Sequence, residues 1–202
     1  MVGTQMVAKG HDFPNITLVG IVCADLSLNF PDFRAGEQTF QLLAQVAGRA
    51  GRGDKPGRVI LQTYTPDHFS ITAAREQDYR AFYEREIAFR EGLGYPPYSR
   101  MIQLKISGKD KKKTARHAEA VGERCQMVRQ RLFGGPREVD ILGPVEASMA
   151  KVANRYRWQI LLKSPSAGRL RQFVRELIFA EDAPAPRGDL RMVVDVDPFS
   201  MM

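Results

Sequence analysis

The chain has 202 residues, of which 44% are hydrophobic and 26% charged, and its formal net charge is +7; this composition is that of a soluble globular protein with one large domain or two small ones. No run approaches the roughly 18 to 20 apolar residues of a membrane helix, and the first residues lack the pattern of a signal peptide. Cys23 and Cys125 are too few for a structural zinc site, so we expect both to be reduced core residues of a cytoplasmic protein.

The basic excess is confined to the second half of the chain. Residues 1–100 hold 11 Lys and Arg against 11 Asp and Glu, whereas residues 101–202 hold 19 against 12. This asymmetry favours nucleic-acid contact by the second half, because clustered positive charge attracts phosphate backbones. A basic surface that only solubilises the protein is the alternative.

The first half reads as strand, helix, strand. Residues 16–24 are apolar and β-branched, which predicts a buried strand of a parallel sheet. A loop at 26–36 leads into a helix expected from Glu37 to Gly51, and residues 58–63 form a second short apolar strand. This order predicts part of an α/β domain with a parallel sheet. An exposed half-sheet of this kind would allow self-association.

A connecting region follows. Residues 66–92 are predicted to be helical in two pieces with one buried stripe. The segment 94–98, Gly-Tyr-Pro-Pro-Tyr, cannot continue a helix, because a residue before proline is pushed towards extended geometry. We therefore expect three regions: 1–65, a connector at 66–100, and 101–202.

The second half alternates strands and helices. The patterns predict a strand at 101–107, a helix at 111–132, a strand from about 142, a strand at 157–163, a helix capped by Ser166, and a strand at 190–196. A turn around Ala153 and Asn154 joins the two middle strands. The resulting order β-α-β-β-α-β predicts an α+β domain of the ferredoxin-like type.

One short segment, residues 45–52, has an unusual local chemistry. It reads Gln-Val-Ala-Gly-Arg-Ala-Gly-Arg, and on a helix Gln45, Arg49 and Arg52 would share one face. The small residues between them let a backbone or a large ligand approach closely. Guanidinium groups suit phosphate oxygens, so the pair reads as an arginine finger for a γ-phosphoryl group. The alternative is a small-residue helix packed on a sheet, with its arginines solvated or ion-paired.

Two motifs, taken together, carry a family resemblance. Residues 3–15, Gly-Thr-Gln-Met-Val-Ala-Lys-Gly-His-Asp-Phe-Pro-Asn, and residues 45–52 resemble motifs V and VI of superfamily 2 helicases. Their form is most similar to the primosomal protein N′ family of replication-restart DNA helicases. Four later segments also look like that family's C-terminal region: 95–100, 142–144, 157–159 and 195–198. The resemblance covers essentially the whole chain and implies part of a RecA-like helicase lobe 2, followed by a C-terminal DNA-binding domain.

The resemblance also implies roles for individual residues. Those acting at the nucleotide would be the arginine finger Arg52, its neighbour Arg49, and Gln45, which would order the site. Thr4 would contact the DNA backbone. Those coupling DNA contact to the nucleotide would be Lys9, Gly10 and Asp12.

Some parts of a complete motor are absent from this sequence. It has no Gly-x-x-x-x-Gly-Lys-Ser/Thr phosphate loop and no Asp-Glu-x-His segment for magnesium. The family's cysteine-rich zinc element is missing too, so no metal site is expected here. The resemblance implies ATP, Mg²⁺ and Zn²⁺ in an intact family member. We therefore expect a C-terminal fragment that alone neither hydrolyses ATP nor unwinds DNA.

Candidate DNA contacts in the second half are Lys151, Arg155, Arg157 and Trp158, because basic residues bind phosphates and aromatic rings stack on bases. Strand alternation puts Tyr156 and Trp158 on one face and the two arginines on the other. Trp158 is therefore either a stacking platform or a core residue. The family implies forked and single-stranded DNA, primosome proteins and single-strand-binding proteins as partners. A stand-alone nucleic-acid-binding or assembly module without a motor is the alternative function.

Overall fold

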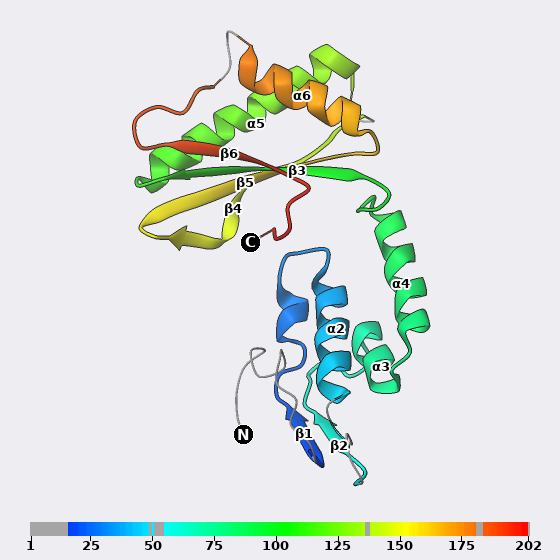
Figure 1. Ribbon diagram of the computed structural model, residues 1–202. Helices are drawn as coiled ribbons and strands as arrows, with labels where there is room; N and C mark the ends of the chain where they lie inside the picture. The colour runs from blue at the N-terminus through cyan, green and yellow to red at the C-terminus, as the bar shows by residue number, and fades with distance from the viewer. Residues whose placement is uncertain (1–15, 49, 51–54, 136–137, 181–183, 202) are drawn as a thin grey trace. The chain divides into compact units, whose positions relative to one another are not determined.

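The computed structural model describes residues 16–48, 50, 55–135, 138–180 and 184–201 (Figure 1). The described residues up to Phe89 form one compact unit, and those from Arg90 onward form a second. Among the described helices, none combines the length and apolar character needed to cross a membrane. The three expected regions are divisions by function, which the boundary between the two compact units does not test. They therefore remain a prediction.

The first unit is an α/β arrangement, as predicted. Two strands pair in parallel, with Leu18 opposite Arg58 and Ile21 opposite Leu61. A parallel pair needs a crossover between its strands, and helix α2 supplies it. The elements of this unit are β1 (Leu18–Ile21), the 3-10 helix η1 (Leu26–Asn29), α2 (Ala35–Ala47), β2 (Arg58–Leu61) and α3 (Phe69–Glu76). Helix α4 (Tyr79–Gly92) follows and runs across the boundary between the units.

The core of this unit combines aromatic and aliphatic side chains, and it covers only one side of the strand pair. Phe40 of α2 stacks on Phe82 of α4, with ring centroids 4.3 Å apart. Ile21 and Leu61 pack against this cluster. In contrast, Leu18 is 59% exposed, so the prediction of a fully buried strand is wrong. Burial on both faces requires a covering layer on each side, and the described residues supply one.

Cys23 is also exposed, which corrects the expectation that both cysteines lie in the core. It follows the end of β1 and has a φ of 52°. The left-handed backbone at this position departs from the extended geometry expected for the apolar run at 16–24, in which Cys23 was predicted to be buried.

The second unit has the predicted β-α-β-β-α-β order. Its sheet has the strand order β4-β5-β3-β6, and all neighbouring strands are antiparallel. The ferredoxin-like prediction is therefore confirmed. The elements are β3 (Arg100–Gly108), α5 (Lys111–Phe133), β4 (Asp140–Val152), β5 (Arg155–Ser164), α6 (Ala167–Phe179) and β6 (Arg191–Val196).

Local chemistry explains where these elements begin and turn. The Asp110 side chain accepts a 2.8 Å hydrogen bond from the Lys113 amide and caps α5. Ser166 caps α6 by accepting from the Arg169 amide, as predicted. The β4–β5 turn is centred on Ala153 and Asn154, both with positive φ, which is the geometry of a tight hairpin.

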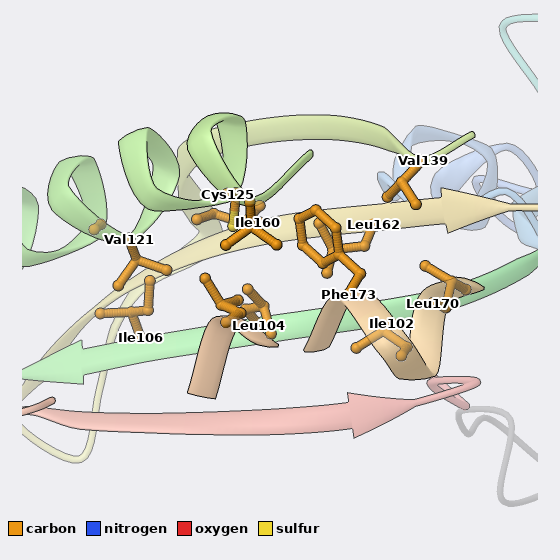
Figure 2. Packing of buried hydrophobic residues seen from close by; sticks show 13 residues of the cluster. Ile102, Leu104, Ile106, Val121, Cys125, Val139, Ile160, Leu162, Leu170 and Phe173 are labelled. Atoms are coloured by element: carbon orange, nitrogen blue, oxygen red, sulfur yellow. The ribbon is translucent and has the colours of Figure 1, made fainter. Parts of the chain in front are cut away.

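Both helices cover the same face of the sheet (Figure 1). Strand residues Ile102, Leu104 and Ile106 face the helices and are at most 5% exposed. Figure 2 shows them packed against side chains of α5 and α6, including Cys125 and Phe173. Burial raises the pKa of the Cys125 thiol to about 12, so this cysteine is a core residue, as predicted.

The opposite face, here named the open face, carries the alternate residues of the same strands. The chain after β6 runs back over part of it (Figure 1). The Asp197 amide donates to the Met101 carbonyl over 2.9 Å, and the Gln103 side chain donates to the Met201 carbonyl over 3.3 Å. Under this tail, Met101 and Gln103 are each only 1% exposed. These two hydrogen bonds therefore hold the C-terminal tail, residues 197–201, against the sheet.

Candidate nucleic-acid interface

Most of the predicted nucleotide site lies outside the described residues. This applies to Thr4, Lys9, Gly10, Asp12, Arg49 and Arg52. Gln45 is described and is exposed on the last turn of α2. The helix ends at Ala47 with Gly48 as its C-cap, earlier than the predicted end at Gly51. Glycine in a helix interior is unfavourable by about 1 kcal/mol relative to alanine, which explains the early end.

The hairpin of β4 and β5 holds the predicted DNA contacts of the second unit. Arg157 pairs with Ser107, and Trp158 pairs with Ile106. Because directly opposite residues share a face, Arg157 lies on the open face and Trp158 on the helix face. The predicted separation of the arginines from the aromatic residues is confirmed.

Trp158 packs against the hydrophobic core cluster and is partly buried. Of the two roles considered for Trp158, a stacking platform or a core residue, this position corresponds to the core residue. On the same face nearer the turn, the Lys151 ammonium lies 4.8 Å from the Tyr156 ring centroid. Lys151 and Tyr156 are paired residues of the two strands, so this contact follows from the register. A role for Trp158 or Lys151 in DNA binding stays a prediction.

Arg155 is held by backbone carbonyls. Its guanidinium donates to the Ser107 carbonyl over 3.1 Å and to the Asp189 carbonyl. It thereby ties the start of β5 to the end of β3 and to the loop before β6. The Asp189 carboxylate accepts a hydrogen bond from the Lys109 amide, and this bond, with Arg155 nearby, lowers the pKa of Asp189. Arg155 is thus already engaged in the fold.

Arg157 differs from Arg155 although both lie on the open face. It is half-buried, and its guanidinium has no hydrogen-bond or ion-pair partner among the described residues. Across the sheet, Ser107 also pairs with Arg191 of β6. Arg191 is exposed and likewise has no partner within the described part of the chain. Sequence reasoning missed Arg191, because only the strand order brings it beside Ser107.

Another basic side chain of β5 is structural. Lys163 is 8% exposed, and its ammonium donates to the Leu93 carbonyl over 2.8 Å. The same ammonium lies 4.7 Å from the Tyr95 ring centroid and 3.9 Å from the Asp140 carboxylate. The Tyr-Pro-Pro-Tyr segment is therefore fastened to β5 through this lysine. Two basic residues of β5, Arg155 and Lys163, thus make hydrogen bonds within the folded domain.

Metal-ligating residues are not clustered in the described ranges. No group of three or more His, Cys, Asp or Glu there could hold a metal ion. The described residues therefore do not provide the donor set that Zn²⁺ requires.

Comparisons with known proteins match the whole chain. The family model described as primosomal protein N C-terminal domain matches residues 91–199. The protein named replication restart protein PriA from Synechocystis is 42% identical over all of this chain, which covers 23% of that protein. The proteins of the same name from Bacillus subtilis and Treponema pallidum are 39% and 42% identical over the full chain, covering 24% and 29% of their lengths. The chain thus spans about a quarter of the length of these relatives.

Proposed function

Since this chain belongs to the primosomal protein N C-terminal domain family, we propose that it is the C-terminal part of an ATP-dependent DNA helicase that recognises stalled or branched replication forks. Such a helicase promotes primosome assembly and replication restart. The observation that carries the proposal is similarity, over the whole of this chain and about a quarter of their own length, to proteins named replication restart protein PriA. The proposed partners are forked and single-stranded DNA, primosome proteins and single-strand-binding proteins, in the cytoplasm.

Within this function, residues 1–65 form the end of helicase lobe 2. Arg52 places its guanidinium at the γ-phosphate of ATP, with Arg49 beside it and Gln45 ordering the site. Bound ATP with Mg²⁺ supplies the free energy for translocation, and the phosphate loop that holds it belongs to another part of the helicase. The exposed position of Gln45 on α2 is compatible with this role.

Coupling to DNA belongs to residues 3–15. Thr4 grips a backbone phosphate, and Lys9, Gly10 and Asp12 link this grip to the nucleotide. A hydroxyl and a closely approaching glycine backbone hold phosphate without reading sequence, as a translocating motor requires. The 202-residue chain alone is inactive in hydrolysis and unwinding, because it has no phosphate loop.

Residues 101–202 form the DNA-binding domain of this proposal, since they hold the whole basic excess. We expect the chain to bind forked and single-stranded DNA weakly, with an affinity that falls steeply between about 50 and 200 mM salt. Fluorescence anisotropy with labelled DNA of both forms, at those two salt concentrations, measures this. Absence of binding at the lower salt concentration would contradict the DNA-binding role.

The arginine-finger role is tested by Arg52→Ala in a longer protein that carries this sequence together with its phosphate loop. DNA-stimulated ATP hydrolysis should fall by roughly 10³-fold or more, because charge on the transferring phosphoryl group loses its stabilising guanidinium. DNA affinity should change little. Steady-state ATPase rates and anisotropy provide the two measurements. An ATPase rate close to that of the unaltered protein would remove Arg52 from this role.

A further inference from the structure

The open face of the second unit is divided into two parts of different chemistry. Towards one end, the C-terminal tail is hydrogen-bonded to Met101 and Gln103, which are each 1% exposed. Towards the other end the strands carry Ser107, Arg157 and the exposed Arg191. Both helices lie on the opposite face (Figure 1). The basic residues are therefore found where the described chain leaves the sheet uncovered.

The two arginines are placed symmetrically about a hydroxyl. Ser107 of β3 pairs with Arg157 of β5 on one side and with Arg191 of β6 on the other. Neighbouring strands are about 4.8 Å apart, so the two arginine backbones lie roughly 10 Å apart with Ser107 midway. We name these three residues the open-face row. Its side chains are two planar guanidinium forks and one hydroxyl on the same face of the sheet.

The charges of Arg157 and Arg191 differ from those around them in having no acidic partner among the described residues. The neighbouring Lys105 is neutralised by Asp195, with nitrogen and oxygen 2.8 Å apart. Arg155 donates to the carbonyls of Ser107 and Asp189, and also to the Ser107 hydroxyl oxygen over 3.4 Å, which leaves the hydroxyl proton of Ser107 free to donate. These acceptors are neutral and leave the positive charge of Arg155 in place. Arg157 and Arg191 have no ion-pair partner within the described residues. Asp189 offsets part of the charge near Arg155, and the row itself remains positive.

The helix layer shows a different pattern of charge. There Arg131 pairs with Glu176 of α6, and Arg169 pairs with Glu138. Lys111 at the start of α5 pairs with Glu146 over 2.9 Å. Acids thus offset several basic residues on that layer, and no comparable row of arginines flanks a hydroxyl there among the described residues.

We propose that the phosphate backbone of a DNA strand crosses the open face over Ser107, with Arg157 and Arg191 each binding a phosphate. This rests on the proposed DNA-binding function and specifies where the strand lies. Guanidinium forks bind phosphate oxygens in bidentate fashion, and the Ser107 hydroxyl can donate to a phosphate between them. Contacts of this kind carry no sequence information, so binding through the row is insensitive to base sequence.

The test compares two double variants of the 202-residue chain that lose equal charge. The first, Arg157→Gln with Arg191→Gln, removes both forks from the open face. The control, Arg116→Gln with Arg171→Gln, removes two exposed arginines from α5 and α6 on the other side of the sheet. Binding of a labelled single-stranded oligonucleotide is measured by anisotropy over a series of salt concentrations.

We expect the open-face variant to bind at least tenfold more weakly at low salt, while the control stays within about twofold of the unaltered chain. The slope of log affinity against log salt should become shallower by roughly 1.4, since each lost phosphate contact on single-stranded DNA contributes about 0.7. A third variant, Arg157→Lys with Arg191→Lys, keeps the charge and should retain most of the slope. Thermal unfolding midpoints of all variants should agree, because neither arginine has a structural partner in the described residues.

Three outcomes would overturn the proposal. The open-face variant could bind with unchanged affinity and slope while the unaltered chain binds DNA, which refutes the row and leaves the DNA-binding function standing. An equal loss in the control would show a general charge effect without a local site. If the unaltered chain bound no DNA at low salt, the row and the proposed DNA-binding function would both fall.

Discussion

At the scale of single residues, chemical type alone does not decide what a side chain does. Arg155 and Arg157 are two residues apart on one strand and share the open face. Arg155 donates hydrogen bonds to the carbonyls of Ser107 and Asp189, so its truncation would remove contacts that link β5 to β3 and to the loop before β6. Arg157 has no such partners in the described structure and remains available to a ligand. The contacts of each arginine side chain, and not its charge alone, therefore indicate whether it stabilises the fold or can bind a ligand.

The role of Gly122 also depends on which atoms surround it and not on its residue type alone. It lies in the middle of α5, where alanine would normally favour the helix by about 1 kcal/mol. A Cβ atom at Gly122 would stand 2.7 Å from Cδ of Pro144 in β4. The close approach of the helix to this strand thus requires a residue without a side chain.

We predict that Gly122→Ala lowers the free energy of unfolding by about 1 to 3 kcal/mol, because overpacking outweighs the gain in helix propensity. Gly168→Ala in α6 is the matched control. Its Cβ would meet nothing closer than the Ser166 hydroxyl at 3.7 Å, so stability should stay the same or rise by up to about 1 kcal/mol. Urea unfolding followed by circular dichroism measures both. Equal effects in the two variants would argue against the steric explanation.

At the scale of elements, the two sheets differ in how their strands are supported. Strands β3 and β5 each have a hydrogen-bonded neighbour on both sides, and residues such as Leu104 and Ile160 are completely buried. Strands β1 and β2 have each other as their only neighbours in the described structure, and Ile60 is 51% exposed. Apolar residues occur in the strands of both sheets. Their difference lies in how many layers and strands surround them.

We expect backbone amides of β3 and β5 to exchange with solvent deuterium much more slowly than those of β1 and β2. Exchange from central strands requires extensive unfolding, whereas weakly supported strands open locally at low cost. Hydrogen exchange measured by mass spectrometry on the 202-residue chain gives protection for peptides from both sheets in one experiment. Comparable protection of the two sheets would show that β1 and β2 are more firmly held than their burial suggests.

At the scale of the whole molecule, the basic excess lies within one of the two compact units. The compact unit from Arg90 onward contains all of residues 101–202, which carry the basic excess, and the domain model matches residues 91–199. Positive charge is therefore a property of the second unit. Some of this charge is paired with acids, as in Arg131 with Glu176 and Arg169 with Glu138 on the helix layer.

The sequence by itself determined the order of the elements and several of their boundaries. Strand alternation and helical periodicity are local properties, so the β-α-β-β-α-β order, the Ser166 cap and the turn at Ala153 and Asn154 were all predictable. The motif pair at 3–15 and 45–52 indicated the family, which the domain model supports. The outline of the candidate site, arginines on one face of β5 and aromatic residues on the other, was also predictable.

Only the tertiary structure decided which residues meet and which are covered. Local pattern placed β1 in a buried sheet and Cys23 in a core, and both expectations failed because burial depends on layers supplied from elsewhere in the chain. Likewise, Arg191 lies 84 positions from Ser107 in the sequence, and the sheet order alone pairs them. Hydrogen bonds between strands distant in sequence thus create the open-face row, since no local periodicity specifies which strands become neighbours.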